Sequence, residues 1–270
     1  MTVHNLNSKF VVCGHRGFAA EYPENTMSSF RAAAELGVDM IEMDVVCSKE
    51  GIPVICHDYE LERTSDGVGL LADYTLEELR SYNMAAKFVK RPMVERIVTF
   101  EEMCALLDEF PELMFNIDMK TDDGTIANRV ADIVENKGYK DRVVFNGLNG
   151  YGLAQMHDRG FMVEASPDGF YGMKNFACLL GDGVKKAEAL CYNACQHVNP
   201  ENVEKLKKDY GVEVWAWCSS WDGYSRCPDG SMKKTDCREC VQNMLDNGVT
   251  MALCNHPDRV IEYLKEKGLR

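Results

Sequence analysis

Strand-like and helix-like segments alternate along the chain, and this alternation restricts the fold more than any other feature of the sequence. Apolar runs rich in β-branched residues lie at 10–13, 40–47, 52–56, 114–119, 142–146, 161–165, 213–218 and 250–254, with a weaker run near 195–198. Amphipathic helical patterns separate most of these runs. Regular alternation of strand and helix predicts a parallel sheet covered by helices.

Several helical patterns carry start and stop signals. The first runs from a capped start to Gly37 in ENTMSSFRAAAELG. Two further patterns begin with threonine followed closely by glutamate, which is the chemistry that caps a helix start: TLEELRSY and TFEEMCALLDEF. The patterns near the C-terminus have proline at the first turn and glycine at the end: NPENVEKLKKDYG and HPDRVIEYLKEKG. These signals predict well-defined helices between the strands.

The size of the chain favours a closed barrel over an open sheet. The chain has 270 residues, and about eight strand–helix units fit a (β/α)8 TIM barrel. No Gly-x-Gly-x-x-Gly or Walker loop follows the first strand, which argues against a nucleotide-binding sheet. Residues 48–98 contain the strand-like IPVICHD but few barrel-like units. We therefore expect one α/β domain over 1–270, with 48–98 as a small insertion after the second barrel strand.

Composition and charge limit the class of partner. The apolar content of 46% is enough for a sizeable core. A net charge of −13 argues against nucleic-acid binding, which normally requires a basic face. The N-terminus lacks a signal pattern, and no apolar run approaches about 18 residues, so we expect a cytoplasmic protein without stable membrane insertion. An anionic substrate would need a local positive site. The oligomeric state is not predicted.

The chain has twelve cysteines, but a disulfide framework is typical of short secreted domains. Several of these cysteines lie in strand-like runs, where cysteine acts as a small hydrophobe, so we expect reduced thiols. Cys237 and Cys240 have zinc-ligand spacing, with Cys218 and Cys227 upstream. The irregular upstream spacing favours instead a long loop after the seventh barrel strand, which would overhang the active site and influence specificity.

Polar residues occur at the ends of several predicted strands. In a (β/α)8 barrel, such residues face the active site at the C-terminal end of the barrel. Residues two apart in a strand share one face. Four strands thus bring acids, histidines and cations to one end of the sheet: His15 and Arg16, Glu42 and Asp44, His57 and Asp58, and Asn116, Asp118 and Lys120.

The residue types indicate the chemistry. Glu42, Asp44 and Asp118 would repel one another without a cation, and all-oxygen ligands select Mg²⁺ or Ca²⁺. Two histidines suit proton transfer near neutral pH. Arginine and lysine suit an anionic group such as phosphate. Other assignments remain open: Lys120 could simply pair with Asp118, Arg16 with Glu24, and Asp58 suits a turn or an indirect contact better than a metal ligand.

The motifs GHRG…PENT, IEMDV, GIPVICHD, FNIDMK and HVNPENVEKLKKDYGVEVWAWC occur in this order between residue 11 and about residue 260. In order and spacing, they resemble the glycerophosphodiester phosphodiesterase family. The resemblance implies a phospholipase-C-like barrel and metal-dependent hydrolysis of glycerophosphodiesters to an alcohol and glycerol 3-phosphate. It also implies residue roles, with one Mg²⁺ or Ca²⁺: acid–base catalysis by His15 and His57, metal binding by Glu42, Asp44 and Asp118, and substrate contacts by Arg16, Lys120 and Trp217.

The sequence departs from the family pattern at four places. Asp118 replaces a glutamate, Asn146 replaces a frequent serine, WCSS replaces WTVN, and CNHP at 254–257 replaces TDxP. These changes affect the expected identity of the substrate more than the expected type of reaction. They leave open a phospholipase-D-like or sugar-phosphodiester hydrolase. A non-catalytic phosphate-binding protein is a further alternative, against which the intact histidines and acids argue, and Trp217 could belong to the core.

No protein nucleophile is apparent beside the histidines, since Cys13 lies within the first strand and Ser28 within the first helix. The hydroxyl next to the phosphorylated carbon of glycerol could take this role. One histidine would deprotonate that hydroxyl and the other would protonate the leaving alcohol, giving a cyclic phosphate that water then opens.

Overall fold

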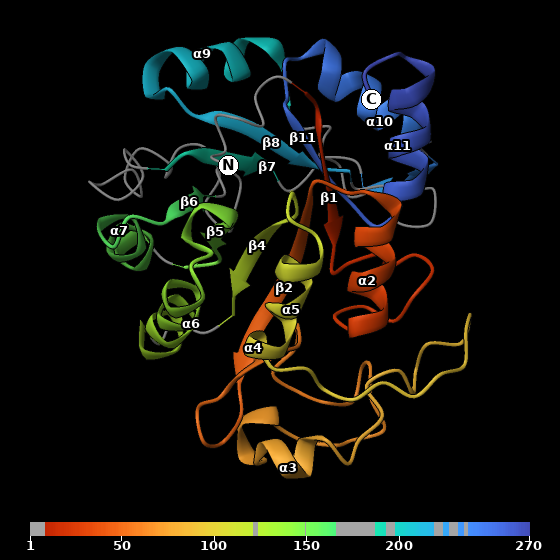
Figure 1. The fold of residues 1–270 in the computed structure, drawn as a ribbon. Helices are drawn as coiled ribbons and strands as arrows, with labels where there is room; N and C mark the ends of the chain where they lie inside the picture. Colours follow the sequence, from red (N-terminus) through yellow and green to blue (C-terminus); the bar gives the residue numbers. More distant parts are fainter. Residues whose placement is uncertain are drawn as a thin grey trace.

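Eight parallel strands close into a barrel in the computed structural model (Figure 1). Each barrel strand pairs with the next one along the chain, and β1 pairs with both β2 and β11, which closes the ring. The predicted (β/α)8 barrel is therefore confirmed. The barrel strands are β1 (Val11–His15), β2 (Met40–Cys47), β4 (Met114–Met119), β5 (Val143–Asn146), β6 (Met162–Ala165), β7 (Ala189–Tyr192), β8 (Glu213–Trp217) and β11 (Met251–Cys254).

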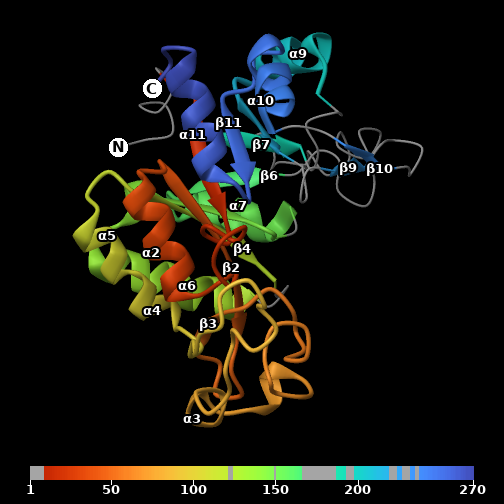
Figure 2. The same cartoon turned by 90° about the vertical axis from the view of Figure 1, so that its right-hand side faces the viewer.

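The structure describes residues 9–120, 124–148, 150–165, 187–192, 198–218, 224–226, 232–234 and 237–270. Helices lie outside the barrel strands in both views (Figures 1 and 2). They are α2 (Met27–Leu36), α4 (Phe100–Met103), α5 (Ala105–Glu109), α6 (Gly124–Lys137), α7 (Gly150–Asp158), α9 (Pro200–Tyr210), α10 (Cys237–Asp246) and α11 (Pro257–Glu266), with a 3₁₀ turn η2 (Lys140–Arg142) before β5.

The predicted helix signals act as caps. The Thr26 hydroxyl accepts a hydrogen bond from the Ser29 backbone N–H at the start of α2, and Gly37 ends this helix in the left-handed conformation. Thr99 and Glu102 form a reciprocal capping box at α4. Asn199 caps α9, which has proline in its first turn. These caps fix where the chain leaves each strand and begins the next helix.

One strand lies elsewhere than the sequence indicates. The strand between β6 and β8 is β7, whose four residues Ala189–Tyr192 are all buried. Of the weak run near 195–198, residues 195–197 lie outside the described part, and Val198 is described but lies outside any strand. Only apolar residues form β7, without an adjacent turn signal, so periodicity could not distinguish it from a buried helical segment.

Residues 48–98 extend β2 into a small insertion at the C-terminal end of the barrel, at the bottom of Figures 1 and 2. It contains β3 (Pro53–Ile55), which pairs antiparallel with β2, η1 (Leu71–Asp73) and α3 (Leu76–Leu79). A small cluster of buried apolar residues holds it together, with Val46 and Val54 at the barrel side and Leu61, Leu71 and Leu79 further out. The insertion thus has its own packing beside the barrel.

Two apolar layers hold the barrel together. The larger one lies between the strands and the surrounding helices. The smaller one fills the inside of the barrel at its N-terminal end, with side chains from alternate positions of the strands: Val11, Cys13, Met40, Met114, Val144, Ala189, Cys191, Trp215 and Met251. The next inward-facing positions along these strands are polar, and they lead to the C-terminal rim.

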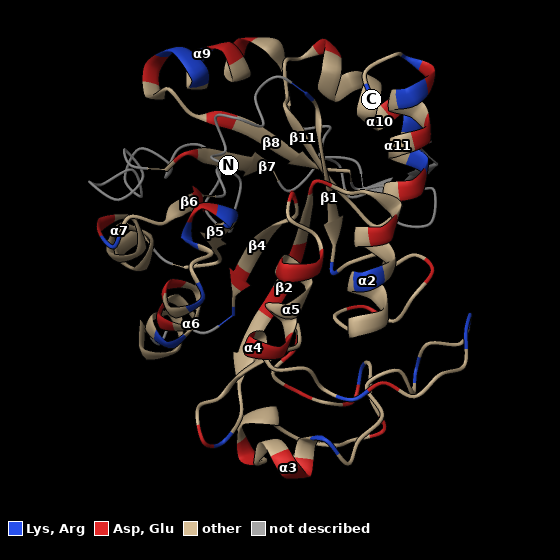
Figure 3. Ribbon diagram, in the orientation of Figure 1, with Lys and Arg blue, Asp and Glu red and all other residues tan. Residues whose placement is uncertain are grey.

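Charged residues lie mostly on the helices and on the insertion (Figure 3). Two further strands, β9 (Tyr224–Arg226) and β10 (Met232–Lys234), pair antiparallel with each other outside the barrel (Figure 2). Among the described residues, no helix is long and apolar enough to cross a membrane. The nine cysteines in the described part form no disulfide, and eight of them are buried.

Candidate active site at the C-terminal rim of the barrel

The strand period brings the predicted site residues to one place. Side chains two apart face the same side of a strand, so the inward series in β2 runs from Met40 through Glu42 to Asp44. The series in β4 runs from Met114 to Asp118, and its register places Asp118 beside Asp44. In β1 the same face leads from the buried Cys13 to His15. Apolar residues thus close the bottom of the barrel, and acids and a histidine face its open end.

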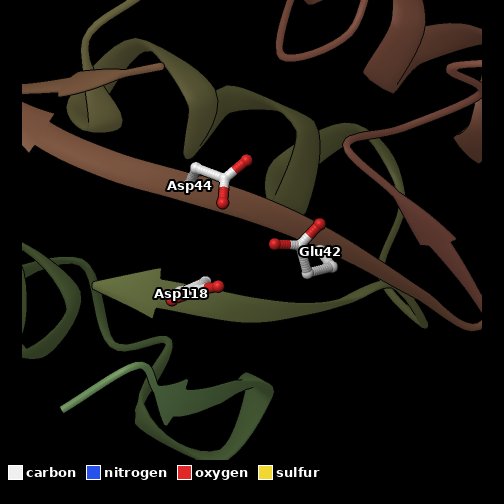
Figure 4. Close-up of side chains that lie close together, drawn as sticks. All are labelled: Glu42, Asp44 and Asp118. Atoms are coloured by element: carbon white, nitrogen blue, oxygen red, sulfur yellow. The ribbon is translucent and has the colours of Figure 1, made fainter. Parts of the chain in front are cut away.

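Glu42, Asp44 and Asp118 form a carboxylate cluster, with the first two side chains on β2 and the third on β4 (Figure 4). One oxygen from each residue lies within 4.8 Å of the others. Among the described residues, this is the one group of histidine, cysteine, aspartate and glutamate side chains close enough to share a metal ion. Glu42 and Asp44 are buried, and Asp118 is half-buried.

Two cations contact the carboxylate cluster. Lys120 Nζ lies 2.5 Å from Asp118 Oδ2 and 2.9 Å from Asp44 Oδ1. Arg16 Nε lies 3.0 Å from Asp44 Oδ2, and Arg16 Nη1 donates to Glu24 Oε1 at 2.7 Å. The pairings of Lys120 with Asp118 and of Arg16 with Glu24, considered from sequence, are therefore both present. Each cation also reaches Asp44, so both belong to the site.

The charges of the carboxylate cluster are not fully compensated. Burial raises the pKa of Glu42 well above its ordinary value, and Asp44 and Asp118 raise it further. Burial, together with the charge of Asp44, also raises the pKa of Asp118, although Lys120 lowers it. For Asp44, the effect of burial is outweighed by Arg16 and Lys120, which hold its pKa below the ordinary value. One acid is thus ionised beside two that resist ionisation without further positive charge.

The carboxylate cluster fits a hard divalent cation. Within the described part of the protein, Asp44 Oδ1 is buried and accepts no hydrogen bond, although Lys120 Nζ is 2.9 Å away. Three carboxylates from neighbouring strands offer only oxygen atoms, the ligands that Mg²⁺ and Ca²⁺ prefer. A cation between them would remove the repulsion that raises the pKa values of Glu42 and Asp118.

His15 lies beside the cluster at the end of β1. Its Nε2 is 3.9 Å from Glu42 Oε2, and its Nδ1 is 2.7 Å from Asn255 Oδ1. The Trp217 ring packs against the imidazole, with ring centroids 5.3 Å apart. Burial, and then the Arg16 guanidinium, lower the pKa of His15 to about 4. The imidazole is therefore neutral at pH 7 and can accept a proton.

His57 follows β3, the strand of the insertion that pairs with β2. β3 runs antiparallel to β2, and the backbone N–H of Cys56 donates to the Asp44 carbonyl at 3.1 Å, so His57 lies beside the middle of β2. Its Nδ1 lies 2.5 Å from Asp58 Oδ1, and a third of the side chain is exposed. Asp58 contacts His57 and not the carboxylates of the cluster, in agreement with the indirect contact considered from sequence.

The loop between β1 and α2 holds Arg16 in place. Arg16 has a left-handed φ of 54°, and its backbone N–H donates to Glu42 Oε2 at 2.9 Å. Asn25, with φ of 55°, donates from Nδ2 to Asp44 Oδ2 at 2.7 Å. Such left-handed positions are uncommon outside glycine and concentrate at functional sites. The PENT motif therefore supports the carboxylate cluster as well as starting a helix.

Three residues of the site were missed by sequence reasoning. Asn255 contacts His15 from the end of β11, and Asn25 contacts Asp44 from the first loop. Glu164 lies inside the barrel on β6, where Asn116 Nδ2 donates to its Oε2 at 2.5 Å. The only sequence signal for Asn255 was its position in CNHP at 254–257, a stretch that departs from the family pattern TDxP. The contacts of Asn25 and Glu164 depend on pairings between distant strands and loops.

The sequence of this chain is similar to those of known proteins. A model of the glycerophosphoryl diester phosphodiesterase family matches residues 15–145. The glycerophosphodiester phosphodiesterase of Caldanaerobacter subterraneus subsp. tengcongensis is 28% identical over 267 residues, which cover 96% of this chain and 100% of that protein. The match to the family model begins at His15 and includes β2, β3 and β4, and hence most of the residues described above.

Solved structures show the same fold. A glycerophosphoryl diester phosphodiesterase from Parabacteroides distasonis superposes with a TM-score of 0.76 at 22% identity, covering 99% of this chain and 93% of that chain. A phosphodiesterase from Oleispira antarctica, in complex with the product sn-glycerol-3-phosphate, gives a TM-score of 0.72 at 18% identity, covering 96% and 98%.

The sequence matches to named phosphodiesterases define the class of the protein as a phosphoric diester hydrolase, and its fold is a (β/α)8 barrel. Over residues 15–145 the sequence is similar to the glycerophosphoryl diester phosphodiesterase family, and over nearly its whole length to a glycerophosphodiester phosphodiesterase.

Proposed function

We propose that this protein hydrolyses glycerophosphodiesters to an alcohol and glycerol 3-phosphate, with the help of one divalent cation. The observation that carries the proposal is the carboxylate cluster beside His15, Arg16 and Lys120 at the open end of the barrel. The name of the Caldanaerobacter relative and the product bound to the Oleispira protein support the same substrate class.

Glu42, Asp44 and Asp118 would hold the cation, either Mg²⁺ or Ca²⁺. When bound, such an ion acts as a Lewis acid at a phosphoryl oxygen and stabilises the charge that develops there. Arg16 and Lys120 would contact the remaining phosphoryl oxygens, since both already lie within 3.0 Å of the cluster. Trp217 would form an apolar wall beside His15.

His15 and His57 would move the protons. One imidazole removes the proton from the glycerol hydroxyl next to the phosphorylated carbon, and this oxygen attacks phosphorus. The bond from phosphorus to the alcohol breaks, and the other imidazole protonates the leaving oxygen. Water then opens the cyclic phosphate with the proton transfers reversed. An in-line attack requires the base and the acid on opposite sides of phosphorus, and His15 and His57 would take these positions from the end of β1 and from the segment after β3.

Products and substrate range test the proposed function. We expect purified protein with Mg²⁺ or Ca²⁺ to release glycerol 3-phosphate from at least one member of a panel of glycerophosphodiesters. Absence of turnover on the whole panel, or release of free glycerol with a phosphorylated alcohol, would show that the proposed substrate or cleaved bond is wrong.

A deoxy substrate tests whether the neighbouring hydroxyl of the substrate attacks phosphorus. A glycerophosphodiester analogue without the neighbouring hydroxyl should bind but react far more slowly, because the attacking oxygen is missing. Binding is measured by competition with the parent diester. Equal turnover of analogue and parent would mean that water attacks phosphorus directly.

A further inference from the structure

Arg63 lies in the insertion and makes three contacts with two acidic residues of the site. Its Nε donates to Asp58 Oδ2. Its Nη1 and Nη2 donate to the two oxygens of Glu24 at 2.9 and 2.6 Å. The guanidinium therefore uses its planar fork, a geometry that lysine cannot reproduce.

Asp58 and Glu24, the two acids that Arg63 contacts, each accept a hydrogen bond from a different residue of the site. Asp58 Oδ1 accepts from His57 Nδ1 at 2.5 Å, while Glu24 Oε1 accepts from Arg16 Nη1 at 2.7 Å. Arg16 in turn reaches Asp44. A continuous series of polar contacts thus runs from His57 to the carboxylate cluster, and Arg63 is its middle member.

The contact with Asp58 determines how His57 can act. A carboxylate accepts hydrogen bonds, so Asp58 holds the proton of a neutral His57 on Nδ1 and leaves Nε2 able to accept a proton. Asp58 is only partly buried, with 27% of its side chain exposed. Without Arg63 it could rotate toward water or swing away from Glu24, which carries the same charge.

We infer that Arg63 is a positioning residue: it fixes Asp58 and Glu24 so that His57 and Arg16 keep their orientation toward the carboxylate cluster. The insertion then contributes to catalysis. This inference rests on the proposed function for its kinetic consequences, but not for the orientation of His57.

The kinetic test compares Arg63→Ala and Arg63→Lys with the wild type. We expect kcat to fall about 10- to 100-fold in Arg63→Ala, the usual effect of residues that orient a site, with a much smaller change in KM. Arg63→Lys keeps the charge and should restore only part of this loss. Millimolar guanidinium chloride should raise the activity of Arg63→Ala but not that of the wild type. The matched control is Arg80→Ala, because Arg80 is a similarly exposed arginine of the insertion that pairs with Glu102 on α4.

A second readout does not depend on activity. In ¹⁵N spectra of the imidazole groups, His57 should be a single Nδ1–H tautomer in the wild type and a mixture in Arg63→Ala. An unchanged tautomer together with kcat equal to that of Arg80→Ala would overturn the inference, whatever happens to thermal stability. If the wild type itself is inactive on all glycerophosphodiesters, the proposed function fails, and the tautomer comparison still decides the role of Arg63. If Arg63→Ala does not fold, Arg63→Lys replaces it in both measurements.

Discussion

Gly147 illustrates at the scale of single residues how tightly the site is built. It follows β5 with φ of +73°, a conformation that favours glycine. A Cβ at this position would collide with Asp118 Oδ1 and with the backbone of Met119. The left-handed turn therefore allows the chain to pass directly beside a carboxylate of the cluster.

We expect Gly147→Ala to weaken metal binding about 10- to 100-fold, because it must displace the Asp118 carboxylate. Gly138→Ala is a suitable control: Gly138 has φ of +75° and no atom within 4 Å of the added Cβ. Both variants should lose roughly 1–3 kcal/mol of stability from backbone strain, and Gly147→Ala should lose more because of its collision with the Met119 backbone. Calorimetric titration with Mg²⁺ or Ca²⁺ measures the difference. Equal metal affinity of the two variants would show that Asp118 does not depend on this contact.

The two histidines provide the second test at this scale. His15→Ala and His57→Ala should each lower turnover by about 10²- to 10⁴-fold, the usual effect of removing a positioned acid or base. Both lie at strand ends outside the apolar layers, so circular dichroism should show an unchanged fold. Near-normal turnover of either variant would exclude the catalytic role of that histidine.

The sequence allowed these histidines and the carboxylate cluster to be predicted because they depend on local rules. A strand places residues two apart on one face, and parallel strands end at the same rim, so Glu42, Asp44 and Asp118 could be grouped without coordinates. The contacts of Asn255 with His15 and of Arg63 with Glu24 join segments far apart in sequence. No periodicity encodes such contacts.

At the scale of elements, the strands with β-branched residues and clear boundaries were predicted well, and β7 was not. The positions inside the barrel were also only partly predicted. Asn116 on β4 was expected on the same face as Asp118, but its partner Glu164 on β6 was not foreseen. Asn146 on β5 donates to Asn116, so three neighbouring strands share one polar network beside the carboxylate cluster.

Glu164 gives this network a pH dependence. Burial raises the pKa of Glu164 from 4.5 to about 8, so the folded protein keeps this proton at pH values where the unfolded chain has lost it. Stability contributed by this group therefore falls as pH rises from 4.5 to about 8. Glu164→Gln removes the titration and should be more stable than the wild type by about 1–3 kcal/mol at pH 8, with the difference vanishing near pH 4.

Urea unfolding at a series of pH values measures this effect. Glu204→Gln, on the exposed side of α9, serves as the control and should follow the wild-type pH profile. A Glu164→Gln variant whose stability relative to the wild type does not change with pH would show that Glu164 is ionised in the folded protein.

At the scale of the whole molecule, the apolar interior of the barrel supports a rim of carboxylates. The nearby lysine and arginine side chains do not fully compensate the negative charge of these carboxylates. The two apolar layers secure the strands, while the acids at the open end repel one another. A cation that binds only the folded protein should therefore stabilise the entire barrel, by about 2.7 kcal/mol at a concentration 100 times its dissociation constant.

The most direct measurement of the central claim is turnover of a glycerophosphodiester by protein made metal-free with a chelator, before and after metal is added back. We predict no measurable turnover before addition, recovery with Mg²⁺ or Ca²⁺, and a parallel rise in melting temperature. In Asp44→Asn, which lacks one carboxylate of the cluster, the metal should restore much less activity. Full turnover by protein shown to be metal-free by elemental analysis would contradict the account.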